Sequence, residues 1–300
     1  MNRKLIIPRR FWKKISKMKL FEYVPDKIAV SIKYRNHFYK KLDLKNPVTF
    51  NEKLQWLKLY DRRPEYTMMV DKYRAKDYIA SVIGQEYIVP TLGAWKTFDE
   101  IDFDALPNQF VLKCNHGSGD VVICRNKATF DMESARQKLT KALNSDYYLV
   151  SREWPYKNVD RLILAEQYLE DAETGDAWDY KFFCFDGKVK CFKVDFDRFS
   201  EHHANWYDRN GCLLPYGEVI CSPCPDKQLD FPEKLSKMID LAERLTCEIP
   251  FLRVDFYYVN RKIYVGELTF YPASGLLPFT EMEWDRIMGS WLKLPDSQRT

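Results

Sequence analysis

The stretch Phe251–Leu276 constrains the fold of this chain more than any other. It reads FLRVDFYYVNRKIYVGELTFYPASGL, in which two apolar runs flank the short polar turn Asn260–Arg261, as in a β-hairpin. Each run carries an acidic residue, Asp255 in the first and Glu267 in the second. If the runs pair around the turn, these carboxylates fall roughly opposite each other. Because an unpaired buried charge is expensive, both carboxylates are expected to have partners.

The alternation of side chains along a strand places two further groups beside the carboxylates. Arg253 precedes Asp255 by two residues and Thr269 follows Glu267 by two, so all four side chains are expected on one face. Oxygen ligands that converge from adjacent strands suit Mg²⁺, which takes one or two carboxylates together with substrate phosphates. The pattern therefore predicts a magnesium site at Asp255 and Glu267. A buried ion pair between Arg253 and one carboxylate is the alternative.

Composition fits a chain with a large core. With 300 residues, 46% hydrophobic and 15% aromatic, it is long enough for one large domain or two interlocked ones. No apolar run approaches the ~18–20 residues of a membrane span, and no signal peptide is visible. A cytoplasmic location with eight reduced cysteines is therefore expected.

Positive charge is concentrated in residues 1–45. This arm holds 14 Lys or Arg against three Asp or Glu, a balance of +11, whereas the rest of the chain sums to −7. Since only the arm is basic, nucleic acid is not expected as a partner. Within residues 3–24, Trp12 and Phe21 lie among the basic residues, which is typical of a helix on an anionic membrane surface. An arm packed on the body with its lysines in water is the alternative.

Two helices are expected before the first long strand. Residues 49–60 begin with Thr49 as N-cap and have Glu52 three residues later, which is the pattern of a capping box. Val70–Ile83 has a second helical pattern. Lys72 would then lie in the first turn, where the helix dipole disfavours a cation unless the cation faces an anion.

A glycine-containing loop between two short strands is a candidate phosphate site. Phe110–Cys114 is an apolar strand that carries Lys113, the loop of residues 115–120 reads NHGSGD, and Val121–Cys124 is a second strand. Backbone N–H groups of such a loop, together with a lysine, neutralise a triphosphate. The motifs GxxxxGK[ST] and GxSxG are absent. A plain hairpin with a surface lysine is the alternative.

Three further features allow more than one interpretation. Residues 147–156 hold a cluster of aromatic residues with Glu153, which indicates either substrate contact or core. Asp195 and Asp197 form a D-x-D, the metal site of many nucleotide-sugar transferases, although residues 102–104 match this weak motif equally well. A C-x₂-C pair raises the question of zinc, but the second half of a zinc motif is missing. The zinc candidates are Cys212, Cys221, Cys224, His202 and His203.

The hairpin and the motifs before it resemble the ATP-grasp ligases. Their metal-binding signature is R-x-D, then E-x-N and a Pro/Gly turn; here it reads Arg253-Val-Asp255 and Glu267-Leu-Thr269, with Thr in place of Asn. The strings DYKFF, RVDFY and GELTF resemble the teichuronopeptide-biosynthesis (TupA-like) type. Members of that family occur among polysaccharide-assembly enzymes and are often labelled glycosyltransferases. The resemblance covers roughly residues 45–290.

The resemblance implies an α+β ATP-grasp fold in which two α+β parts clasp ATP. It divides the chain into a basic arm (1–45), an N-terminal helical part (46–109), a small lid-bearing part (110–190) and a C-terminal metal-binding part (191–300).

The resemblance also implies roles for individual residues. Phosphates, adenine and ribose of ATP would contact Lys72, Lys76, Lys113, His116, Gly117, Ser118, Gly119, Glu166, Gln167, Tyr168, Leu169, Asp179 and Lys181. One or two Mg²⁺ ions would be held by Asp255, Glu267 and Thr269. The transferring phosphate or the substrate would contact Arg253, Lys193 and Arg198.

The function implied is that of an ADP-forming carboxylate–amine ligase. ATP phosphorylates a carboxylate, an amine attacks the acyl phosphate, and an amide is formed. The expected substrates are a sugar carboxylate of a surface or capsule polysaccharide, or of a peptidoglycan-like polymer of the cell envelope, and an amino acid or other amine. Two alternatives stay open: a metal-dependent glycosyltransferase that uses Asp195 and Asp197, and a non-catalytic membrane-associated scaffold.

Overall fold

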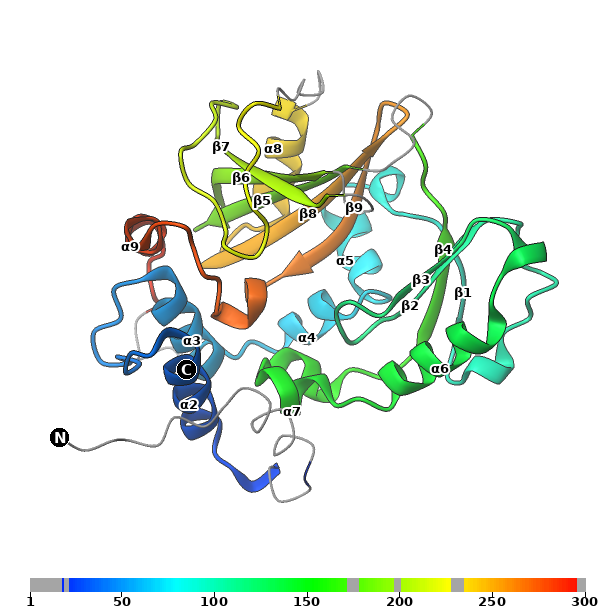
Figure 1. Cartoon of the computed structure of the whole chain (residues 1–300), viewed down its shortest axis with the longest axis horizontal. Helices are drawn as coiled ribbons and strands as arrows, with labels where there is room; N and C mark the ends of the chain where they lie inside the picture. Colours follow the sequence, from blue (N-terminus) through cyan, green and yellow to red (C-terminus); the bar gives the residue numbers. More distant parts are fainter. Residues whose placement is uncertain (1–17, 19–21, 172–177, 197–200, 228–234, 296–300) are drawn as a thin grey trace.

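The computed structural model describes residues 18, 22–171, 178–196, 201–227 and 235–295. Two antiparallel sheets dominate this part of the chain (Figure 1), one with the strand order β1-β4-β2-β3 and one with the order β7-β6-β5-β8-β9. The first sheet consists of β1 (Thr91–Trp95), β4 (Ile163–Gln167), β2 (Phe110–Cys114) and β3 (Val121–Cys124). The second consists of β7 (His203–Asp208), β6 (Lys188–Phe196), β5 (Trp178–Phe185), β8 (Phe251–Val259) and β9 (Lys262–Thr269).

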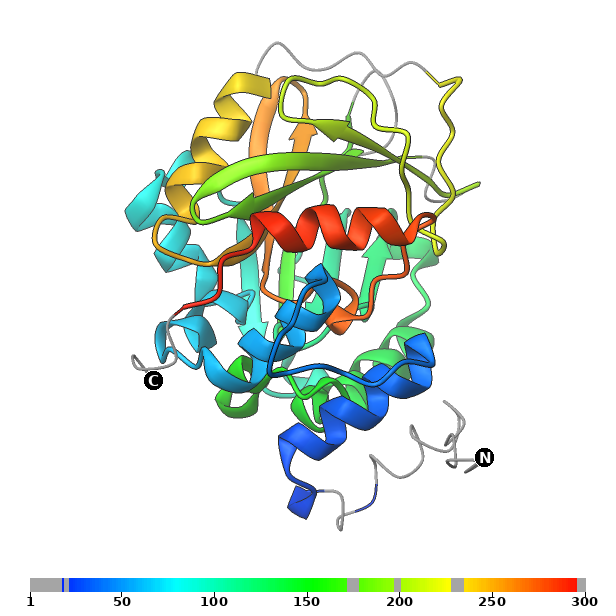
Figure 2. The same cartoon turned by 90° about the vertical axis from the view of Figure 1, so that its left-hand side faces the viewer.

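Helices surround and separate the two sheets. The α-helices are α2 (Asp26–Phe38), α3 (Phe50–Tyr60), α4 (Glu65–Val70), α5 (Ala75–Val82), α6 (Met132–Leu143), α7 (Tyr147–Ser151), α8 (Leu235–Leu245) and α9 (Met282–Trp291). Short 3₁₀ turns are η2 (Gln85–Tyr87), η3 (Phe98–Glu100), η4 (Lys127–Thr129), η5 (Trp154–Asn158) and η6 (Pro272–Gly275). Helices α4 and α5 lie between the sheets, α6 packs on β2, and α8 packs on β5, β6 and β8 (Figure 1). Helix α9 packs on α3 (Figure 2).

The predicted hairpin at residues 251–276 is present as β8 and β9. Asn260 and Arg261 adopt φ angles of 49° and 62°, the left-handed pair that a tight two-residue turn requires. With this turn fixed, Asp255 lies directly opposite Glu267 and Arg253 lies opposite Thr269. The ladder shifts register immediately after Asp255.

Local sequence signals define helix α3 correctly. The Thr49 hydroxyl accepts a hydrogen bond from the Glu52 backbone N–H at 3.2 Å, and the Glu52 carboxylate accepts one from the Thr49 N–H at 3.1 Å. This is the predicted capping box. The short apolar runs predicted as strands on either side of the glycine-containing loop are likewise present, as β2 and β3.

The single helix predicted over Val70–Ile83 is wrong. Helix α4 ends at Val70 and α5 begins at Ala75, with a turn between them. The Asp71 carboxylate accepts a hydrogen bond from the backbone N–H of Tyr73 at 2.9 Å and another from the side chain of Asn115 at 2.8 Å. Because Asp71 is bonded within this turn and to Asn115 in the loop after β2, the backbone leaves the helical path there. Lys72 therefore lies in a turn and not in the first turn of a helix.

Two hydrophobic cores support the sheets. The larger packs the five-stranded sheet against α3, α4, α5, α8 and α9, and the smaller packs β2 and β4 against α6. In the larger core, the ring of Trp206 lies 4.7 Å from that of Phe183 and 6.3 Å from that of Trp284 of α9. Burial of each such side chain contributes about 1.5–3 kcal/mol.

The division of the chain into parts at residues 110 and 190 stays a prediction. Strand β1, which precedes residue 110, belongs to the four-stranded sheet, and strand β5, which precedes residue 190, belongs to the five-stranded sheet.

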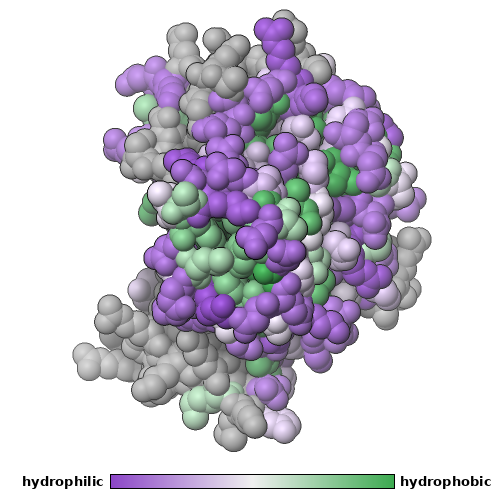
Figure 3. Space-filling model, turned by 90° about the vertical axis from the view of Figure 1, so that its right-hand side faces the viewer, coloured by the Kyte–Doolittle hydropathy of each residue, from purple (hydrophilic) through white to green (hydrophobic). Residues whose placement is uncertain are grey.

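On the side of the four-stranded sheet, apolar residues gather in the middle of the surface and hydrophilic residues surround them (Figure 3). Among the described residues, no helix is both long and apolar enough to cross a bilayer. The predicted membrane-surface segment, residues 3–24, lies almost entirely outside the described residues, and so do Asp197 and Arg198.

Candidate nucleotide and metal site

A row of buried charges crosses one face of the five-stranded sheet. The strand register places Lys181 of β5 opposite Asp255 of β8 and Asp179 of β5 opposite Asp195 of β6. The Lys181 ammonium lies 2.8 Å from Asp195 Oδ2 and 3.7 Å from Asp255 Oδ2, and it also pairs with Asp179. Burial alone would lower the pKa of Lys181, but the three carboxylates outweigh it and raise the pKa. This lysine is therefore charged and holds three carboxylates together.

Arg253 binds Asp255 through two hydrogen bonds. Its Nε and Nη2 atoms donate to the two carboxylate oxygens, both at 2.6 Å, and Nη2 also donates to the Thr269 hydroxyl at 3.1 Å. Burial raises the pKa of Asp255, although Arg253 and Lys181 oppose it, whereas the neighbouring carboxylates raise the pKa of Arg253. The ion pair considered as an alternative is thus present, and it occupies the same residues as the predicted metal site.

The row continues to a carboxylate that the sequence analysis missed. Lys193 lies 2.6 Å from Glu218 Oε1 and 3.5 Å from Asp195 Oδ1. Glu218 belongs to the long loop after β7 and pairs through its backbone with Phe279. No local motif marks Glu218, because its contact with Lys193 depends on the path of that loop.

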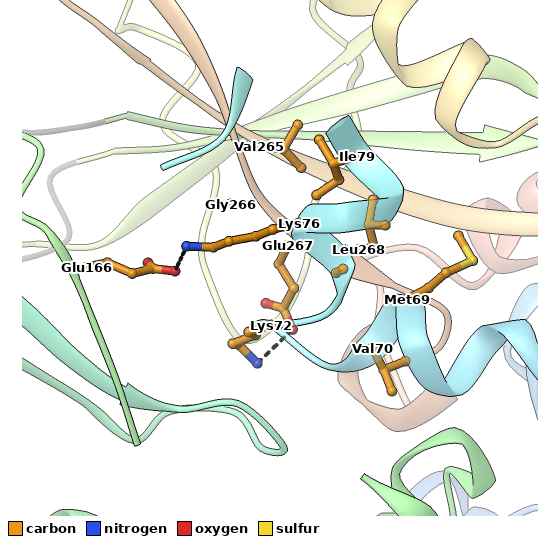
Figure 4. A pocket seen from close by; sticks show the side chains of 11 residues that line it. Met69, Val70, Lys72, Lys76, Ile79, Glu166, Val265, Gly266, Glu267 and Leu268 are labelled. Atoms are coloured by element: carbon orange, nitrogen blue, oxygen red, sulfur yellow. Dashed lines mark ion pairs between the residues drawn. The ribbon is translucent and has the colours of Figure 1, made fainter. Parts of the chain in front are cut away.

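Lysines from the turn after α4 and from the other sheet face this row. Lys72 donates a hydrogen bond to the Gly117 carbonyl at 2.5 Å, and its ammonium lies 3.5 Å from Glu267 Oε1 (Figure 4). Burial alone would raise the pKa of Glu267, but Lys72, Arg253 and other cations outweigh it and lower the pKa. A pocket between α4, α5 and β9 is lined by Lys72, Lys76, Glu166 and Glu267 (Figure 4).

Glu166 joins the other two predicted phosphate lysines. It lies on β4, where its carboxylate is 2.8 Å from Lys76 and 2.5 Å from Lys113. Burial alone would raise the pKa of Glu166, but Lys113 and Lys76 outweigh it and lower the pKa. The sequence analysis placed Glu166 among the residues that contact ATP and did not foresee this contact with two cations. Gln167 is exposed after Glu166, and the half-buried Tyr168 hydroxyl bonds to Arg125 at 3.1 Å.

The first half of the glycine-containing loop is fixed in place. Asn115 donates hydrogen bonds to the Asp71 carboxylate and to the Asp160 carbonyl, at 2.8 and 2.7 Å. His116 is buried beside Asn115, and burial lowers its pKa. Gly117 is buried as well, whereas Ser118 and Gly119 are exposed. Within the loop of residues 115–120, Ser118 and Gly119 thus form the exposed tip.

A second buried polar cluster lies beside the metal candidates. The Lys58 ammonium of α3 donates to the Ser274 carbonyl at 2.9 Å and to the Ser274 hydroxyl at 3.1 Å. Glu153 is 3% exposed, and its Oε1 has no hydrogen-bond partner among the described residues. Burial raises the pKa of Glu153, while Lys58 and Ser274 oppose it. One sequence signal could have identified Lys58 as buried: it follows Leu54 by four residues and therefore lies on the apolar side of α3.

The aromatic residues of the 147–156 segment connect the two clusters. The rings of Tyr147 and Tyr156 lie 4.7 Å apart. The charge of Glu153, burial and the charge of Glu267 raise the pKa of Tyr147, so Tyr147 is within electrostatic reach of both carboxylates. Of the two interpretations given above, the interaction with both charges favours substrate contact, and the half-burial of both rings fits a place at the edge of the core.

Comparison with known proteins agrees with this architecture. The family model for "TupA-like ATPgrasp" matches residues 52–293. No curated protein sequence matches the chain. Solved structures similar to it include D-alanine–D-alanine ligase from Bacillus anthracis, with 16% identity over 68% of this chain and 57% of that chain and a TM-score of 0.37. The ADP complex of N5-carboxyaminoimidazole ribonucleotide synthetase has 16% identity over 73% and 50% of the two chains and a TM-score of 0.43.

The ATP-grasp ligase PsnB with its minimal precursor is also similar, with 11% identity, coverage of 72% of this chain and 60% of that one, and a TM-score of 0.39. The chain thus spans between half and three fifths of the length of these three proteins. The match of the family model covers most of the chain, and it confirms the resemblance and the α+β ATP-grasp fold predicted from the sequence. The chain therefore belongs to the TupA-like ATP-grasp family.

Proposed function

We propose that the protein is an ADP-forming carboxylate–amine ligase. The observation that carries this proposal is the pair Asp255 and Glu267, opposite each other on β8 and β9, with the Lys72 ammonium 3.5 Å from Glu267. Lys76 and Lys113 converge on Glu166 beside the same pocket. Phosphoryl transfer depends mostly on positioning and on neutralisation of charge, and this set of groups supplies both without a protein nucleophile.

The donor atoms around Asp255 suit Mg²⁺. Two carboxylates and the Thr269 hydroxyl offer only oxygen ligands, which is what this hard cation takes. Asp255 and Glu267 would hold the ion, with Thr269 as a weaker neutral ligand in the third position. When bound, Mg²⁺ supplies positive charge to the β- and γ-phosphates. Whether one ion or two bind depends on how well the Thr269 hydroxyl serves as a ligand.

The protein groups have separate tasks in the reaction. A substrate carboxylate oxygen attacks the γ-phosphorus of ATP, the bond to the β–γ bridging oxygen breaks, and ADP leaves. Lys72, Lys76 and Lys113 would bind the phosphates, and Arg253 would stabilise the transferring group. The amine nitrogen then attacks the acyl carbon and loses a proton, and phosphate leaves with the electrons of the broken C–O bond. Lys193 would contact the substrate, and Asp179 would contact the ribose of ATP.

The polar cluster of Lys58, Glu153 and Ser274 would bind the amine substrate, which accepts the acyl group. This cluster lies next to the proposed magnesium ligands: Ser274 follows Thr269 by five residues, and the charge of Glu267 acts on Glu153. An ammonium group matches the Glu153 carboxylate, whose Oε1 has no hydrogen-bond partner among the described residues. The acceptor would thus be an amine that arrives on the side of α3 and α7.

The proposed carboxylate substrate is a uronic acid of a surface polysaccharide or of its precursor, and the proposed amine is an amino acid. Support for the polysaccharide comes only from the type of family to which the chain belongs. The glycosyltransferase alternative finds less support, because the family model that matches residues 52–293 is an ATP-grasp model.

A binding experiment and a turnover experiment test this proposal. Mg·ATP is expected to raise the midpoint of thermal unfolding, whereas a sugar nucleotide with Mn²⁺ is not. ADP release should then require both members of one uronate–amino acid pair from a panel, and the product should contain an amide. Stabilisation by the sugar nucleotide with Mn²⁺, and none by Mg·ATP, would instead establish the transferase alternative.

A further inference from the structure

Three side chains of different chemistry converge where β6 leads into β7. Asp195, His202 and Cys221 each offer one ligand atom, and these three atoms lie within 4.8 Å of one another. The Asp195 Oδ1 and His202 Nε2 atoms are 3.8 Å apart. Asp195 and Cys221 are buried, whereas the His202 side chain is 41% exposed. The group therefore lies at the surface with two of its three members enclosed.

Backbone contacts hold the three residues in this arrangement. Asp195 is paired in the sheet with Ala204, and the Ala204 N–H donates to the Ser222 carbonyl at 3.3 Å. The Cys221 thiol donates to the His202 carbonyl at 3.4 Å. The segment that carries Cys221 is thus attached to the edge strand β7, and the convergence does not depend on side-chain orientation alone.

We propose that Asp195, His202 and Cys221 bind a divalent cation of the zinc type. Zn²⁺ accepts sulfur, imidazole nitrogen and carboxylate oxygen in a tetrahedron, in which ligand atoms lie roughly 3.4 to 3.6 Å apart. The Asp195–His202 separation of 3.8 Å is close to this spacing. A thiolate and an imidazole do not suit Mg²⁺, which prefers oxygen. Three protein ligands leave the fourth position for water or a substrate atom.

The surrounding charge favours a dication. Among the residues that the structure describes, four carboxylates and three cations form the connected row on this sheet face: Asp179, Asp195, Glu218 and Asp255 with Lys181, Lys193 and Arg253. Their charges sum to −1, and a Cys221 thiolate makes the sum −2, which one dication neutralises. Lys193 lies 3.5 Å from the Asp195 Oδ1 atom and is itself paired with Glu218 at 2.6 Å.

This cation site would be separate from the proposed magnesium site but coupled to it. The second oxygen of Asp195 contacts Lys181 at 2.8 Å, and Lys181 also faces Asp255 at 3.7 Å. The cation would therefore fix the β6–β7 edge beside the nucleotide site. Two of the zinc candidates from the sequence, Cys221 and His202, belong to the converging group, whereas Asp195 was not among those candidates; among the described residues, Cys224 is not part of the group.

Metal binding by the full chain, without ATP, tests the proposal directly. The protein is freed of metal with a chelator and titrated with Zn²⁺ against a competing indicator, and then with Co²⁺, whose bond to a thiolate absorbs in the near ultraviolet. We expect one Zn²⁺ per chain and a thiolate–Co²⁺ band. Cys221→Ser should abolish the band, and His202→Ala should weaken Zn²⁺ binding by at least about 10-fold, as loss of a ligand costs no less than loss of an outer-shell partner.

Neighbouring residues of the same types provide the controls. Cys224→Ser and His203→Ala should bind Zn²⁺ and Co²⁺ like the unmodified chain. Since His202 is exposed, His202→Ala is expected to fold, and its unfolding midpoint without metal verifies this. Absence of stoichiometric zinc in the unmodified chain, or equal binding by folded His202→Ala and the unmodified chain, would overturn the proposal. Neither result depends on whether the protein is a ligase.

Discussion

Asp255 and Glu267, direct partners across the β8–β9 ladder, are pushed in opposite directions by their surroundings. Burial raises the pKa of Asp255 despite Arg253 and Lys181, whereas Lys72, Arg253 and further cations outweigh burial and lower the pKa of Glu267. The cations around Glu267 thus favour its charged form, whereas burial opposes the charged form of Asp255. A cation bound between the two carboxylates would favour the charged form of both.

Replacement of Asp255 by Asn should lower ATP turnover by orders of magnitude. The substitution keeps the shape of the side chain but removes the charge that would hold Mg²⁺. Arg253 keeps the Thr269 hydroxyl as a partner, so the far-ultraviolet circular dichroism should stay that of the folded protein. Asp240→Asn, on the exposed side of α8, is the matched control and should turn over ATP normally. Normal turnover by Asp255→Asn would show that the Asp255 carboxylate does not hold the metal ion.

Replacement of Lys113 by Met should weaken Mg·ATP binding. A hydrogen bond to a charged group contributes about 1.5–3 kcal/mol, so loss of the ammonium should raise the dissociation constant roughly 10- to 150-fold. Isothermal titration calorimetry measures this directly. Lys141→Met, on the exposed face of α6 in the same part of the chain, should bind Mg·ATP unchanged. Equal affinities for the two variants would show that Lys113 serves only its ion pair with Glu166.

Local patterns predicted the parts of this site, but not how distant parts meet. The alternation in β8 and β9 and the turn at Asn260–Arg261 act over a few residues, so the Asp255–Glu267 pairing could be read from the sequence. The contact of Lys58 with Ser274 joins residues 216 positions apart in the chain, and no periodicity reports such a contact. The helix predicted through Asp71 failed for the same reason, because Asp71 accepts a hydrogen bond from Asn115, which lies 44 residues further along the chain in the loop after β2.

Replacement of Lys58 by Met should change how stability depends on pH. Burial lowers the pKa of Lys58 to about 8 from an ordinary value of 10.5. Below pH 8 the ammonium is charged in both states, and its burial costs about 3 kcal/mol. Between pH 8 and 10.5 the unfolded chain binds more protons than the folded one, so this cost disappears as the pH rises.

The unmodified protein should therefore gain unfolding free energy relative to Lys58→Met over that pH range, measured by urea denaturation at several pH values. Lys53→Met, on the same helix, bonds through its ammonium to the Gly289 and Leu292 carbonyls and is only partly buried. It should show a much smaller pH-dependent difference. A pH-independent difference for Lys58→Met would mean that Lys58 keeps an ordinary pKa.

Transfer of ¹⁸O from a labelled carboxylate tests the central claim most directly. In an acyl-phosphate mechanism the attacking carboxylate oxygen stays with the γ-phosphorus, so when the amine displaces phosphate one ¹⁸O atom appears in inorganic phosphate. With a uronate–amino acid pair that supports ADP release, we predict one ¹⁸O per phosphate formed, detected by mass spectrometry. Phosphate that carries no label from the carboxylate, while ADP and amide are both formed, would contradict the proposed mechanism.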